Sequence, residues 1–158
     1  MQKITPCLWY NGDAEEAAKF YVTLVPNSRI DRIFRSPVDT PSGKAGSVLT
    51  VEFTLAGTQY LGLNGGPQFR LNEAVSFQIH CDSQAEVDRL WAAIKNGGTE
   101  LGCGWIKDRW GLTWQIVPIR LEELLRDPDA NRAKRAMEAM MTMVKIDIAA
   151  LDRAAGDA

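Results

Sequence analysis

Two stretches of the chain, residues 4–10 and 75–81, place side chains on alternate faces with the two-residue period of a β-strand. In the first stretch both faces are apolar. Each stretch is followed by a turn and then by apolar residues at spacings of three and four, as on the buried face of a helix. We expect Asp13 and Ser83 to cap these helices. The pattern therefore predicts a strand followed by a helix in each half of the chain.

Further strands are expected after each helix, separated by turn residues. They lie at residues 28–34, 48–55 and 59–63 in the first half, and near residues 99–105 and 112–117 in the second half. We interpret residues 107–109, just before the last strand, as a solvated hairpin turn.

These elements indicate an internal duplication. A shift of 71 positions aligns the two leading strands, a shift of 70 aligns the helices, and a shift of 54 aligns the last hairpins. Three alignments in the same order favour two tandem βαβββ modules over an ordinary α+β sandwich. We expect one domain at residues 1–158 of class α+β, with module 1 at about 1–68 and module 2 at about 72–120.

After Pro118 the signals become helical, which predicts a helical tail at about residues 121–158. We expect Asp127 and Pro128 to begin its second helix. An apolar stripe then follows at helical spacing: Met137, Met140, Met141 and Val144. The stripe indicates packing on the sheet or across a dimer, and a methionine-lined groove for varied partners is the alternative.

The composition excludes several classes of function. The 158 residues are 46% hydrophobic and 24% charged, which is typical of a globular protein. With 18 basic and 20 acidic residues the net charge is −2, so we expect no nucleic-acid partner. We expect neither a membrane span nor a signal peptide. Three cysteines without a CxxC pair suit the cytoplasm, and the one histidine, His80, excludes a histidine-rich metal site within one chain.

Five segments carry a resemblance to a known family: ITPCLWYNGDAEEAAKFY (4–21), LNGGPQF (63–69), AVSFQIHCDSQAEVDRLW (74–91), CGWIKDRWGLTWQIVP (103–118) and AMMTMVKIDIAAL (139–151). In these segments the chain resembles the PhnB-like branch of the vicinal oxygen chelate superfamily, which includes glyoxalase I, extradiol dioxygenases and bleomycin-resistance proteins. The branch is often labelled 3-demethylubiquinone-9 3-methyltransferase. The resemblance implies a cup-shaped mixed sheet made by both modules, followed by a C-terminal helical extension.

The resemblance also implies that inward residues of the first, fourth, fifth and eighth strands hold a divalent metal. Strand parity indicates which residues face the cleft. The candidate ligand-binding residues are Cys7, Trp9, Leu61, Gln78, His80, Trp105 and Gln115. Trp9, Trp105 or Trp110 would stack on a planar ligand, and the amides and the imidazole would bind its polar edge.

This set of residues is poor in metal ligands, because Leu61 and neutral amides occupy the implied positions. We therefore expect no cofactor, with a divalent metal at a rearranged site of Cys7, His80 and Gln115 as the alternative. Methyl transfer from S-adenosylmethionine usually requires a glycine-rich turn between a parallel strand and a helix. Residues 64–67 do not have that form, because a proline follows the glycines.

We expect a homodimer that binds a small planar or aromatic molecule. We identify no catalytic residue in the sequence. The alternative is an enzyme. It would be either the methyltransferase of the family label or a metal-dependent lyase, isomerase or dioxygenase.

Overall fold

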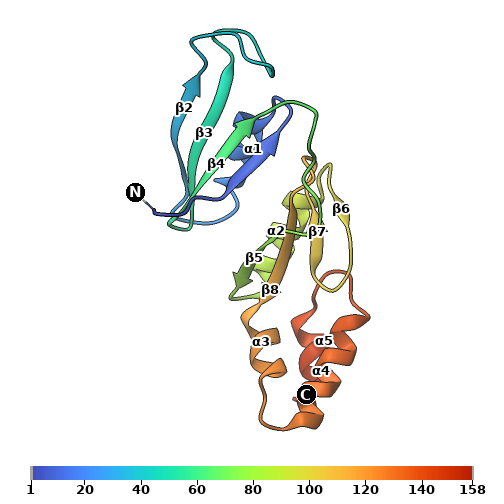
Figure 1. Ribbon diagram of the computed structural model, residues 1–158. Coiled ribbons are helices and arrows are strands. Elements are labelled where there is room, and N and C mark those ends of the chain that lie inside the picture. Colours follow the sequence, from blue (N-terminus) through green and yellow to red (C-terminus); the bar gives the residue numbers. More distant parts are fainter. Residues whose placement is uncertain (1, 158) are drawn as a thin grey trace. The chain divides into compact units, whose positions relative to one another are not determined.

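The structure is a computed structural model that describes residues 2–157, and the chain divides into two compact units between Leu71 and Asn72. Each unit contains one four-stranded mixed sheet with a helix packed against it (Figure 1). The predicted α+β class and the tandem βαβββ modules are confirmed, and the predicted helices follow the second module.

In the first unit the strands lie in the order β1-β4-β3-β2. Strand β1 is parallel to β4, and the other neighbouring strands are antiparallel. The elements are β1 (Cys7–Tyr10), α1 (Ala14–Tyr21), β2 (Arg29–Arg35), β3 (Val48–Leu55) and β4 (Thr58–Asn64). Helix α1 packs on β3 and β4, where Tyr21 and Phe53 are fully buried. Helix α1 covers one face of this sheet, so the opposite face is available to a ligand or a partner.

The second unit repeats this plan with the strand order β5-β8-β7-β6. Its elements are β5 (Ser76–Cys81), α2 (Gln84–Lys95), β6 (Thr99–Glu100), β7 (Trp105–Lys107) and β8 (Thr113–Pro118). Strand β5 is parallel to β8, as β1 is to β4. Leu90 and Ile94 of α2 are buried, as is Trp114 of β8.

The strand register supports the internal duplication. Cys7 lies opposite Leu61 in the first sheet, and Gln78 lies opposite Gln115 in the second. The shifts of 71 and 54 positions found in the sequence relate these two pairs of residues to each other. Equivalent sequence positions therefore occupy equivalent places in the two sheets.

The helical tail packs around a small core of its own. Its helices are α3 (Ile119–Leu125), α4 (Ala130–Met141) and α5 (Ile148–Ala155). The buried side chains are Leu121, Leu124, Ala136, Ile146, Leu151 and Ala155. Met140 and Met143 pack against this core, whereas Met137 and Met141 are exposed. The predicted methionine stripe is therefore divided between a packed face and an exposed face.

Asp13 occupies the N-cap position of the first helix as expected, but it does not cap the helix through its side chain. Instead, the Ala14 N–H at the start of α1 donates to Asn64 Oδ1 at 2.9 Å. The expected cap of the second helix is confirmed, because Ser83 Oγ accepts the Glu86 N–H at 3.2 Å.

The expected start of α4 is wrong. Asp129, not Asp127, caps the helix by accepting the Asn131 N–H at 2.9 Å. Asp127 instead accepts a hydrogen bond from Arg132 Nε at 3.0 Å. Among the described residues, no helix has both the length and the apolar character needed to cross a membrane.

Candidate functional site

One face of each sheet is buried against a helix, and the other carries most of the residues expected to face a ligand. Along β8, Trp114 and Ile116 are buried, whereas Gln115 and Val117 on the opposite face are half-buried. This alternation is what the strand period predicts.

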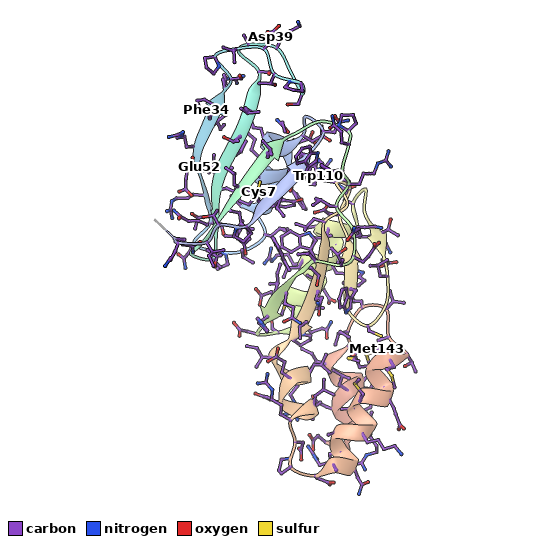
Figure 2. The ribbon with its side chains drawn as sticks, viewed as in Figure 1. Cys7, Phe34, Asp39, Glu52, Trp110 and Met143 are labelled. Atoms are coloured by element: carbon purple, nitrogen blue, oxygen red, sulfur yellow. The ribbon has the colours of Figure 1, made fainter. Side chains whose placement is uncertain are left out.

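On the first sheet, a row of side chains crosses the exposed face. Leu61 on β4 lies opposite Cys7 on β1 and opposite Glu52 on β3, and Glu52 lies opposite Arg32 on β2. Figure 2 labels Cys7 and Glu52 on this sheet. Cys7 is an exposed residue, but its sulfur is partly desolvated by the atoms around it. This desolvation raises the pKa of the thiol. The thiol therefore remains protonated at neutral pH.

A cavity of about 450 Å³ lies on this first unit. Its lining residues are Thr5, Asp31, Glu52, Gln59, Tyr60 and Leu61. Of these, only Leu61 belongs to the ligand-binding set expected from the sequence. Glu52 was missed because the family resemblance directs attention to other strands. The alternation along residues 48–55, applied in the same way as on β1, would have indicated it.

Arginines balance the two carboxylates of the pocket. Asp31 Oδ1 lies 2.7 Å from Arg29 Nε, and Asp31 Oδ2 accepts a hydrogen bond from Thr54 Oγ1 at 2.6 Å. Glu52 Oε1 lies 3.6 Å from Arg32 Nε. The pocket therefore offers oxygen acceptors without a large uncompensated negative charge. Such a site suits the hydroxyl or N–H groups of a neutral ligand.

Trp9 contacts the loop that follows β4. Its indole Nε1–H donates to the Gly66 carbonyl at 2.8 Å, and its ring meets the edge of Phe69 at a centroid distance of 4.9 Å. A Cβ on Gly65 would lie 2.2 Å from the same indole. Trp9 thus holds residues 65–69 in place, and its N–H is already used.

On the second sheet, a chain of side-chain hydrogen bonds crosses the exposed face. Gln78 Nε2 donates to Gln115 Oε1 at 2.8 Å, and Gln115 Nε2 donates to Ser76 Oγ at 2.7 Å. Trp105 lies opposite Gln115 on β7 and is half-buried. The structure therefore brings three of the expected residues together in one row.

His80 lies on the same face of β5 and contacts the helical tail. Its Nδ1 lies 3.1 Å from Glu122 Oε1 of α3. The two side chains are 49% and 28% exposed. Glu122 also lies 3.5 Å from Arg126. Nothing in the local sequence indicates the contact, because it depends on how α3 folds back beside β5.

The expected solvated turn at residues 107–109 is wrong for Asp108, which is buried. Its Oδ1 accepts the Trp110 N–H at 2.9 Å and the Leu112 N–H at 3.1 Å. Its Oδ2 accepts the indole N–H of Trp114 at 2.9 Å. The Arg109 guanidinium lies over the Trp110 ring, 4.5 Å from its centroid. Figure 2 labels Trp110. Arg109 therefore occupies one face of the ring that was expected to stack on a ligand.

The positions implied to be metal ligands do not form a donor set for a divalent cation. Leu61 has no donor atom, and the amide of Gln115 is engaged with Gln78 and Ser76. Within residues 2–157, no three His, Cys, Asp or Glu side chains come close enough together to hold a metal ion. Neutral amides alone would leave a dication without charge compensation. These residues do not fit the metal centre that the superfamily implies.

Comparisons with known proteins identify relatives. The sequence model of a family described as 3-demethylubiquinone-9 3-methyltransferase matches residues 2–117. The solved structure of the PhnB protein from Bacillus cereus is 32% identical, with a TM-score of 0.67, over 74% of this chain and 99% of that one. Protein PA1353 from Pseudomonas aeruginosa is 19% identical, with a TM-score of 0.61, over 75% and 98%. No curated protein matches the sequence significantly. The helical tail lies outside the family match.

Proposed function

Because the chain belongs to the 3-demethylubiquinone-9 3-methyltransferase family of PhnB-like proteins, we propose that it binds a small planar or aromatic molecule in the pocket of its first unit. The pocket is the observation that carries the proposal. Its volume of about 450 Å³ lies within the range of about 300–1,000 Å³ found for small-molecule sites.

The lining of the pocket supports a ligand with an apolar plane and a polar edge. Leu61 provides apolar surface. The ring of Tyr60 stacks on the buried Phe53 with centroids 5.6 Å apart, and burial raises the pKa of its phenol so that it stays neutral. Glu52 and Asp31 offer acceptors, and Gln59 offers both a donor and an acceptor. A quinol, a phenol or a similar neutral hydroxylated ring compound has the matching chemistry.

A thermal-shift screen with quinols, phenols and fused-ring aromatics tests the proposal. A ligand at one hundred times its Kd stabilises a protein by about 2.7 kcal/mol, which raises Tm by several degrees. Leu61→Glu places a second carboxylate opposite Glu52, and we expect it to weaken binding of any hit at least tenfold. Val38→Glu is the matched control, because Val38 is exposed in the same unit and does not line the pocket. If a hit binds Leu61→Glu and Val38→Glu with the same Kd, its binding site lies outside this pocket.

Methyl transfer, as the family description has it, is the enzymatic alternative. Strand β4 ends at Asn64, the next two glycines contact Trp9, and Gly65 has no room for a side chain there. Neither sheet is a doubly wound parallel sheet, where such cofactors are usually held. These residues do not fit a nucleoside site. Calorimetry with S-adenosylmethionine tests this directly, since saturable micromolar binding would overturn our interpretation.

The second enzymatic alternative is metal-dependent lyase, isomerase or dioxygenase chemistry. Metal analysis of the purified protein distinguishes it from ligand binding alone. We expect less than stoichiometric metal after dialysis, because the donor set is poor. Stoichiometric metal together with an activity that chelators remove would favour the alternative.

The proposal includes a homodimer and a cytoplasmic location. The exposed methionines of the tail support self-association. The three cysteines support a reducing compartment, because none of them is paired in the structure described for residues 2–157.

A further inference from the structure

A second cavity, of about 400 Å³, lies on the first unit and shares Gln59 with the first-unit pocket. Its lining residues are Gln2, Arg29, Thr54, Gly57 and Gln59. None of the other four lines the first-unit pocket. The two cavities therefore meet at one side chain, and a ligand of the first could extend into the second.

The register of the first sheet places the two cavities over adjacent rows of one face. Thr54 on β3 lies opposite Arg29 on β2 and opposite Gln59 on β4, and all three line the second cavity. Glu52, which lines the first-unit pocket, lies two positions before Thr54 on the same strand. Alternate residues of a strand share a face and lie about 7 Å apart, so the two rows are within the span of one small molecule.

Asp31 joins the two rows. The register of β2 against β3 shifts by one residue between Ile30 and Arg32, as in a β-bulge, so Asp31 is an additional residue of β2. It lines the first-unit pocket, and its carboxylate contacts two residues of the second cavity. Oδ1 lies 2.7 Å from Arg29 Nε, and Oδ2 accepts a hydrogen bond from Thr54 Oγ1 at 2.6 Å. The boundary between the cavities is therefore held by an ion pair and a hydrogen bond.

The two cavities offer opposite hydrogen-bonding groups. Carboxylate oxygens of Asp31 and Glu52, which accept, line the first-unit pocket. In the second cavity, Arg29 approaches Asp31 through Nε, and no hydrogen bond within residues 2–157 engages its Nη groups. Gln59 Oε1 accepts the Gln2 backbone N–H at 3.4 Å, which leaves the N–H groups of its amide as donors. The first-unit pocket therefore selects a ligand donor, and the second cavity selects a ligand acceptor.

We propose that the ligand carries, besides its hydroxylated ring, a carbonyl oxygen that binds at Arg29 and Gln59 in the second cavity. The proposal rests on the proposed function, because that function places the ring in the first-unit pocket. Asp31 balances the charge of Arg29, so a neutral ketone, ester or amide fits this cavity better than a carboxylate does. The ligand class is a neutral ring compound with a hydroxyl at one end and a carbonyl at the other.

NMR titration of the isotopically labelled chain with two matched probes tests this assignment. The probe 4-(4-hydroxyphenyl)butan-2-one carries the carbonyl, and 4-butylphenol has the same carbon chain without it. We expect only the ketone to shift the amides of Arg29, Thr54 and Gly57, in addition to the first-unit pocket residues that both probes shift. Arg29→Gln is expected to weaken the ketone about fivefold relative to 4-butylphenol, because one hydrogen bond to a charged donor is lost. Both probes present the same phenol to Asp31, so a change at that carboxylate affects both Kd values alike.

Arg35→Gln is the matched control, because Arg35 is exposed on the same strand and lines neither cavity. It is expected to leave the ratio of the two Kd values unchanged. If both probes shift the first-unit pocket but Arg29→Gln also leaves that ratio unchanged, the second-cavity assignment alone is wrong. Tighter binding of 3-(4-hydroxyphenyl)propionate than of the ketone would overturn the choice of a neutral acceptor. If neither probe shifts a residue of the first-unit pocket, the proposed function fails and this assignment fails with it.

Discussion

Asn64 holds the start of helix α1 although 50 positions separate it from Ala14. Its side-chain oxygen accepts the Ala14 N–H, and its amide donates to the Val48 carbonyl at 3.0 Å. Only 6% of Asn64 is exposed, so water does not readily replace either bond. One side chain thereby joins the helix to strands β3 and β4.

We predict that Asn64→Ala lowers the free energy of unfolding by about 1–3 kcal/mol, because it leaves the buried Ala14 N–H without its acceptor and the half-buried Val48 carbonyl without its donor. Asp13→Ala is the control. Its side chain makes no capping bond, so the loss should stay within about 0.5 kcal/mol. Urea denaturation followed by circular dichroism measures both. Equal losses in the two variants would mean that Asn64 does not cap the helix.

The sequence predicts a residue's role when the pattern that indicates it lies in the neighbouring residues. The faces of Gln78 and Gln115 follow from the alternation along their own strands, so the sequence was sufficient. Asn64 and Glu122 act on partners that only the folded chain brings near, and no local pattern indicates them. Asp108 looked like a surface turn residue because its charge suggested solvent, whereas its carboxylate satisfies three N–H groups.

The junction between helix α2 and strand β7 depends on Gly98. A Cβ on this residue would lie 2.4 Å from both the Ile94 and the Lys107 carbonyl oxygens. Both obstacles are backbone atoms, so we predict that Gly98→Ala costs about 3 kcal/mol of unfolding free energy, the upper end for overpacking. Gly102→Ala is the control, because nothing lies within 4 Å of its added Cβ. Denaturation midpoints compare the two, and a mild effect at Gly98 would contradict this geometry.

The helices of the tail are joined by an ion-pair network around Arg132. Its guanidinium lies 2.6 Å from Asp157 and 3.0 Å from Asp127. The hydrogen bond from Arg132 lowers the pKa of Asp157. The Asp129 backbone N–H, and then Arg132, lower the pKa of Asp127. Lowered carboxyl pKa values stabilise the fold above the ordinary pKa of about 4, and this stability is lost as the pH falls through the lowered values.

We therefore predict that acid destabilises the tail below about pH 4 and that this loss is smaller in Arg132→Ala. Lys134→Ala on the same helix is the control, because its pair with Glu138 is long, at 3.7 Å, and exposed. Limited proteolysis across the pH range, read by mass spectrometry, reports opening of residues 119–157. Identical acid profiles for wild type and Arg132→Ala would contradict the role of the network.

Strand and helix positions were predictable from periodicity, but helix starts were less so. The strand at residues 48–55 was predicted with the bounds that the structure shows. The start of α4 was misplaced because Asp127 and Asp129 are both good capping residues, and the sequence does not say which one meets a free N–H. Ser83 was predictable because its partner lies three residues away.

At the scale of the whole molecule, the helical tail lies beyond residue 117, where the family match ends. The tail buries its own core yet exposes Met137, Met141 and Val144. We predict a homodimer by sedimentation equilibrium, and we predict that Met141→Glu shifts it toward monomer through the charge placed on the apolar face. A monomeric wild-type mass at micromolar concentration would contradict the prediction.

The fold was predictable because duplication repeats the same pattern twice, which strengthens each weak strand signal. The pocket was not predictable, since β2 and β3 contribute Asp31 and Glu52 to its lining. Its position requires the register of all four strands. The family resemblance implies ligand positions on strands other than β2 and β3, so it does not indicate how these two strands are aligned with β4.

Chemical-shift mapping of the isotopically labelled chain with the best ligand from the screen tests whether the ligand binds in the first-unit pocket. We expect the largest amide shifts on the six lining residues of this pocket, and we expect Leu61→Glu to remove them. Shifts confined to other residues, or a protein that no compound of the screen perturbs, would contradict it.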